Sequence, residues 1–70
     1  MKINLVDVLK AARHIDGGCS VCICHFLEDL HEHTKIDRQV IIDEFNKLDN
    51  DYLYFTVFLD EYGDIYYKDK

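Results

Sequence analysis

The chain has 70 residues, enough for a single domain whose hydrophobic core supplies only about 3 to 5 kcal/mol of net stability. Hydrophobic residues make up 49% of the chain and charged residues 31%, which excludes an intrinsically disordered composition. Fourteen acidic residues against eight Lys and Arg give a formal net charge of −6, which repels phosphate backbones and favours basic partners. Asp7 and Lys10 interrupt the apolar start before it reaches the length of a signal peptide or membrane span, so we expect a cytoplasmic protein with no membrane partner.

Apolar residues recur at three- and four-residue steps across residues 4–16, and this spacing predicts a first helix. Asn4 can cap its start, and Gly17 can end it. The predicted apolar stripe consists of Leu5, Val8, Leu9, Ala12 and Ile15.

Two more helices are predicted between residues 20 and 49. Ser20 is the expected cap of a helix that runs to about His33, and Asp37 is the expected cap of a helix that runs to about Asp49. The core-facing residues are Ile23, Phe26, Leu27 and Leu30 in the first of these and Ile41, Phe45 and Leu48 in the second, with Ile36 packing against Ile41.

Residues 52–60 are rich in aromatic and β-branched residues and alternate in the way a strand does. Gly63 allows a short loop, and residues 64–68 return as the hairpin partner. The expected fold is therefore α+β, with three helices followed by a C-terminal β-hairpin in one domain over residues 1–70. This element order resembles a minimal winged-helix domain, although no family motif is matched.

The winged-helix resemblance implies a third helix that enters the DNA major groove, and the charges argue against that role. The outward positions of this helix are Gln39, Asp43, Asn46 and Lys47, and acidic residues occupy the tip of the wing. We therefore expect no direct nucleic-acid binding. A winged-helix transcription regulator remains the alternative if Arg13, Lys35 and Arg38 cluster.

The acidic residues themselves are the predicted binding surface. They can occupy a basic groove on another protein and so imitate nucleic acid, whereas the competing interpretation is a solvated surface that only keeps a small protein soluble. The residues predicted to contact a partner are Glu28, Asp29, Glu32, Asp43, Glu44, Asp60, Glu61 and Asp64, together with Tyr52 and Tyr54.

Small size, acidity, absence of proline and absence of enzyme motifs resemble the profile of small phage-encoded anti-CRISPR proteins, including Cas9 inhibitors. The segments HFLEDLHEH and DNDYLYFTVFLDEYGD carry this resemblance. It implies a non-catalytic protein in the host cytoplasm that occupies the basic nucleic-acid-binding or PAM-reading surface of a CRISPR effector nuclease. This resemblance does not assign a functional role to any particular residue of the chain.

The segment CSVCICH, residues 19 to 25, contains residues that could bind a metal ion. Cys19 and Cys22 have the two-residue spacing of zinc ligands, and His25 follows three residues later on the same flank of the predicted helix. Two candidates remain for the fourth zinc ligand, which are Asp29 and a residue of a partner chain. The competing interpretation is that Cys22 and Cys24 only fill space in the core.

Catalysis and redox chemistry are not expected from the same segment. The CSVC motif lacks the preceding strand and following helix of a thioredoxin-like unit, and nothing orients His25 as a base for a cysteine nucleophile. We therefore predict that the protein is not an enzyme.

The predicted hairpin has two faces, and the three helices can cover only one of them. Tyr52, Tyr54 and Phe58 share that face in the predicted strand, which indicates a contact with a partner or a homodimer interface. The alternative is that Lys68 and Lys70 shield the face.

Overall fold

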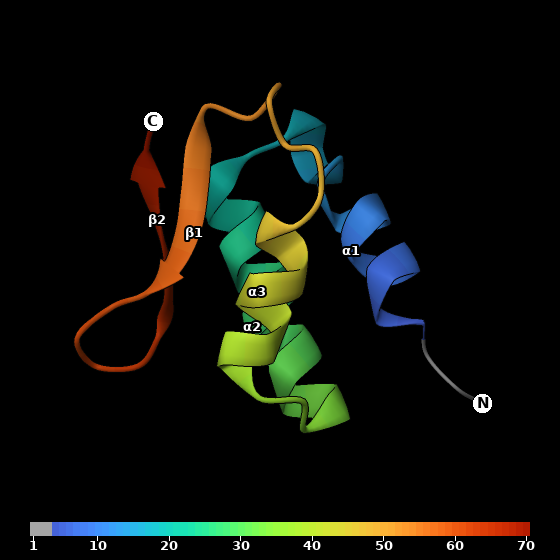
Figure 1. Cartoon of the computed structure of the whole chain (residues 1–70), viewed down its shortest axis with the longest axis vertical. Coiled ribbons are helices and arrows are strands. Elements are labelled where there is room, and N and C mark those ends of the chain that lie inside the picture. The colour runs from blue at the N-terminus through green and yellow to red at the C-terminus, as the bar shows by residue number, and fades with distance from the viewer. Residues whose placement is uncertain (1–3) are drawn as a thin grey trace.

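The computed structural model describes residues 4–70, and it has the predicted α+β order of three helices and a C-terminal antiparallel hairpin. In Figure 1 the hairpin lies along one side of the helices and α1 lies on the other side. Strand β1 packs on α3, β2 packs on α2, and α1 contacts both α3 and α2. The elements are α1 Leu5–Ala12, the 3-10 helix Ile15–Gly17, α2 Ser20–Thr34, α3 Arg38–Asn46, β1 Phe55–Leu59 and β2 Ile65–Asp69.

Helix α1 begins as predicted but ends four residues early. The Asn4 side chain accepts a hydrogen bond from the Asp7 N–H at 3.3 Å, which confirms the predicted cap. Beyond Ala12 the chain reaches Asp16, Gly17 and Gly18, whose φ angles of 48°, 69° and 93° cannot continue a right-handed helix. A side chain at Gly18 would bring Cβ within 3.1 Å of Leu53 Cδ2, so glycine is required at this turn.

Helix α2 is capped one residue earlier than predicted. Cys19 is the N-cap, so the prediction of a Ser20 cap was wrong. Ser20 is instead the first helical residue and is buried, with its hydroxyl 3.2 Å from the hydroxyl of Tyr54. That partner lies 34 residues away, so the sequence pattern near Ser20 could not indicate it. The helix ends at Thr34, and Lys35 follows in the left-handed region with φ 62°.

Helix α3 has the predicted Asp37 cap, which accepts from the Gln39 N–H at 3.0 Å. It ends at Asn46, three residues earlier than predicted. The Phe45 carbonyl accepts the Leu48 N–H at 3.2 Å and the Asn50 side-chain amide at 2.9 Å, and these bonds close the last turn.

Strand β1 begins at Phe55 rather than at residue 52. The Leu53 N–H donates to the Asn50 carbonyl, so this segment forms a turn before the strand. Within the strand the predicted alternation holds, with Phe55 and Val57 buried and Phe58 exposed. The strands pair in antiparallel register from Phe55 opposite Asp69 to Leu59 opposite Ile65.

One hydrophobic core joins all three helices and both strands. None of the helices among residues 4–70 has the length and apolar character needed to cross a membrane. The largest fully buried side chains are Leu9, Ile23, Leu27, Ile41, Phe45 and Phe55.

Candidate acidic binding surface and cysteine pair

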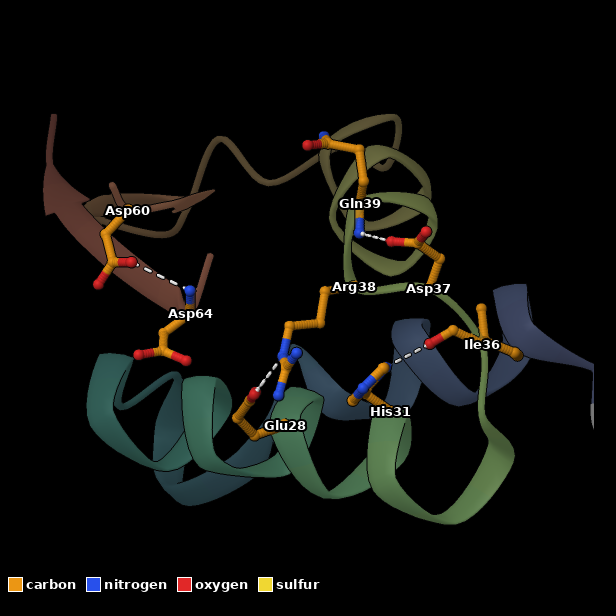
Figure 2. A network of polar contacts seen from close by, with 8 residues as sticks. All are labelled: Glu28, His31, Ile36, Asp37, Arg38, Gln39, Asp60 and Asp64. Carbon is orange, nitrogen blue, oxygen red and sulfur yellow. Dashed lines mark hydrogen bonds and ion pairs between the residues drawn. The ribbon is translucent and has the colours of Figure 1, made fainter. Parts of the chain in front are cut away.

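Arg38, at the start of α3, lies between carboxylates from two other elements (Figure 2). Its Nε donates to both carboxylate oxygens of Glu28 in α2, at 2.5 and 2.9 Å. The hydrogen bond to Glu28 raises the pKa of Arg38, and the charges of Glu28, Asp64 and Glu32 add to this effect. The guanidinium is therefore a single cation shared among acids of α2 and of the hairpin turn.

The hairpin turn holds its own acids by backbone hydrogen bonds. Asp60 Oδ1 accepts from the N–H groups of Tyr62 and Asp64 at 2.9 and 3.0 Å, and Gly63 adopts φ 83°. Figure 2 shows Asp64 across from Arg38 and Glu28, while the Asp60 carboxylate is turned to the Asp64 N–H. We call the group Glu28, Glu32, Asp60 and Asp64 the acidic face.

The other predicted carboxylates lie on α2, in the hairpin turn and on α3. Asp29 and Glu61 are exposed and adjoin the acidic face in sequence. Asp43 and Glu44 lie on α3 and have local partners there. Gln39 donates to Asp43 at 2.9 Å, and Lys47 donates to Glu44 at 3.0 Å.

The two predicted contact tyrosines lie outside the hairpin, in the segment between α3 and β1. Tyr52 stacks on His14 with ring centroids 5.7 Å apart, and the Arg13 guanidinium lies 5.8 Å from the centre of the Tyr52 ring. Tyr54 contacts Phe55 edge to face and reaches Ser20 with its hydroxyl. Both rings remain more than half exposed, but they help to attach this segment to α1 and α2.

The outward face of the hairpin carries a different aromatic pair. Phe58 and Tyr66 are 37% and 53% exposed, and they pack edge to face at 6.2 Å across the two strands. A pocket of about 330 Å³ lies between α2 and β2, and Glu28 and Tyr66 both line it. This pocket connects the acidic face with the aromatic side of the hairpin. The sequence pattern does not predict this pocket, because its walls come from segments about forty residues apart.

The cations of the described residues do not form the cluster that a DNA-binding helix needs. On α3, Arg38 pairs with Glu28 and Lys47 pairs with Glu44. Arg13 donates to the Asp49 carbonyl at 2.6 Å. Arg13 precedes α2 and Lys35 follows it, so a helix of 15 residues, about 22 Å long, separates them.

Cys19 and Cys22 lie together in the first turn of α2. The amide groups of Cys22 and Val21 and the Cys22 thiol lower the pKa of Cys19, although no cap hydrogen bond of standard geometry forms. The neighbouring Asp16 carboxylate and Cys19 sulfur, together with burial, raise the pKa of Cys22 to about 12. Both thiols are partly exposed, and their pKa values are shifted in opposite directions.

The zinc ligands predicted from the sequence are only partly brought together. His25 is exposed and lines the pocket against β2, beside the buried Cys24. Residues 4–70 contain no group of three or more His, Cys, Asp or Glu side chains that could hold a metal ion. Zinc at Cys19, Cys22 and His25 stays a prediction, and the metal content of the purified protein tests it.

Comparison of the chain with protein-family models, with curated proteins and with solved structures found no match in any of the three.

Proposed function

We propose that this protein is a non-catalytic binding module whose acidic face occupies a basic surface of another protein. The supporting observation is the set of carboxylates from α2 and the hairpin turn around the single cation Arg38. Three carboxylates, those of Glu28, Glu32 and Asp64, act on one guanidinium, and Asp60 in the same turn adds a further negative charge. Such a field attracts Lys- and Arg-rich surfaces and increases the rate of association with them.

The target class is the nucleic-acid-binding surface of a protein, such as a CRISPR effector nuclease. Surfaces of this kind present Lys and Arg to phosphates, and the carboxylates of the acidic face offer them the same charge. Phe58 and Tyr66 lie on the same hairpin and add apolar and cation–π contact area. The proposal places the protein in the cytoplasm, where such targets act, and it requires no bond to be made or broken.

Binding to a cationic probe tests the proposal. Labelled protein is titrated with an arginine-rich peptide and with a guide-loaded CRISPR effector nuclease over a series of salt concentrations. We expect binding that weakens as salt rises, because exposed charges are screened. We also expect the nuclease to lose affinity for its DNA target when the protein is present.

Matched double variants locate the binding surface. Glu32→Gln with Asp64→Asn removes two exposed charges of the acidic face, each worth about 0.2 to 1 kcal/mol at an exposed contact, so affinity should fall roughly tenfold. Asp51→Asn with Asp69→Asn makes the same change in net charge at exposed positions near the other end of the hairpin, and it should leave affinity nearly unchanged. Equal losses for the two double variants would show that net charge alone is responsible.

A winged-helix transcription regulator is the alternative, and the element order favours it. It predicts binding to labelled duplex DNA with an affinity that falls steeply with salt. Duplex binding of that kind, together with no binding to either cationic probe, would replace the first proposal.

A further inference from the structure

The two cysteines at the start of α2 differ from the third in position and exposure. Cys19 is the N-cap, and Cys22 lies in the first turn three residues later. Both side chains are partly exposed. Cys24 is only 8% exposed and belongs to the hydrophobic core. The chain therefore presents one accessible pair of thiols and one protected thiol.

The backbone before α2 holds the pair in a fixed position. The left-handed turn at Gly18 fits against Leu53 with almost no spare room, since an added Cβ would lie 3.1 Å from that side chain. The Cys19 N–H donates to the Ile15 carbonyl at 3.1 Å, and its carbonyl accepts the Ile23 N–H at 2.9 Å. Both ends of the Cys19 peptide segment are thus anchored, so its backbone is held at the helix start, three residues before Cys22.

Disulfide formation suits this arrangement. Cys19 at the N-cap and Cys22 three residues later form a Cys-x-x-Cys pair at the start of a helix, the position at which reversible disulfides of this spacing occur. Of the two thioredoxin-like features expected to be missing around the CSVC motif, helix α2 supplies the following helix, whereas a 3-10 helix, Ile15–Gly17, precedes the motif in place of a strand.

We propose that Cys19 and Cys22 form a reversible intramolecular disulfide, with a small-molecule disulfide such as oxidised glutathione as the oxidant. The Cys19 sulfur attacks one sulfur of glutathione disulfide, breaks its S–S bond and releases one glutathione thiol. The Cys22 sulfur then attacks Cys19, forms the Cys19–Cys22 bond and releases the second glutathione. Two protein thiols lose two electrons and two protons, and the two leaving glutathiones gain them. This modification is independent of the proposed binding function.

Thiol counting tests the proposal. The full chain is reduced, treated with a metal chelator, incubated with oxidised glutathione, quenched in acid, and alkylated after denaturation. Intact mass should show one alkylated thiol in place of three, and peptide mapping should place the bond between Cys19 and Cys22. Dithiothreitol should restore all three alkylated thiols.

Two variants make the result specific. Cys22→Ser should retain one glutathione on Cys19, because no second thiol displaces it. Cys24→Ser should form the same Cys19–Cys22 disulfide as the native chain. The proposal is overturned by three free thiols after oxidation, by a glutathione adduct that persists on the native chain, by a bond that involves Cys24, or by zinc that the chelator leaves on these thiols and that prevents their oxidation.

Discussion

Arg38 shows how the surroundings of one side chain can reverse its expected role. In the sequence it is a cation that could contact phosphate, whereas in the fold it is paired with Glu28 and lies near Asp64 and Glu32. Its partners come from α2 and from the hairpin turn, and neither is close to it in sequence. The guanidinium therefore limits repulsion within the acidic face.

Replacing Arg38 should destabilise the fold. Arg38→Gln leaves three neighbouring carboxylates without their cation, so the free energy of unfolding should fall at low ionic strength, and by more than in the Lys47→Gln control. High salt should reduce this loss because it screens the repulsion. Urea unfolding at low and high salt measures both effects. Lys47→Gln removes an exposed pair on α3 and is the control, with a loss below about 0.5 kcal/mol. A stability at low salt equal to that of the native chain would refute the prediction.

Cys24 should make stability depend on pH in the alkaline range. Burial raises the pKa of Cys24 from 9.0 to about 11, so its thiol stays neutral in the folded chain while the unfolded chain ionises near pH 9. The stabilisation is fully present below pH 9 and is lost as pH rises to 11. Thermal unfolding between pH 8 and 11 should show a steeper fall in Tm for the native chain than for Cys24→Ala. Parallel pH profiles for the two proteins would contradict the prediction.

At the scale of single elements, α2 ends with an unfavourable backbone angle. Lys35 has φ 62° directly after the helix, in a region that only glycine adopts without cost. Lys35→Gly should therefore raise stability by about 0.5 to 1 kcal/mol, which is roughly 2 to 8 °C in Tm for a domain of this size. Calorimetry measures the shift. Lys35→Ala is the matched control and should bring no such gain, and a lower Tm for the glycine variant would contradict the prediction.

The central parts of each element could be predicted from the sequence, and the ends could not. Periodic apolar residues indicate the helix interiors, and the local caps Asn4 and Asp37 are correct because their hydrogen bonds lie within three residues. The wrong boundaries depend on contacts between distant segments. Gly18 is fixed by Leu53, and Ser20 is fixed by Tyr54. The candidate binding surface also depends on contacts between distant segments. Its carboxylates can be read from the sequence, but their grouping around Arg38 cannot.

For the whole molecule, the core should tolerate little loss. Leu27 is fully buried in α2, and Leu→Ala at such a site costs about 2 to 5 kcal/mol. A domain of this length has a comparable total stability, so Leu27→Ala should be largely unfolded at 25 °C. Val40 is 46% exposed, so Val40→Ala should stay within about 0.5 kcal/mol of the native chain. Circular dichroism with a urea titration distinguishes the two, and a folded Leu27→Ala chain would show a more stable core than expected.

The position of α1 has a consequence for dynamics. Figure 1 places this helix on the side of α2 and α3 away from the hairpin, and its eight residues are too few to stay helical alone. The described members of the acidic face all lie on α2 and on the hairpin turn. A transient detachment of α1, seen as faster amide hydrogen exchange there than in α2, would leave those carboxylates in place, so the proposed recognition of a basic partner would survive partial opening of the molecule.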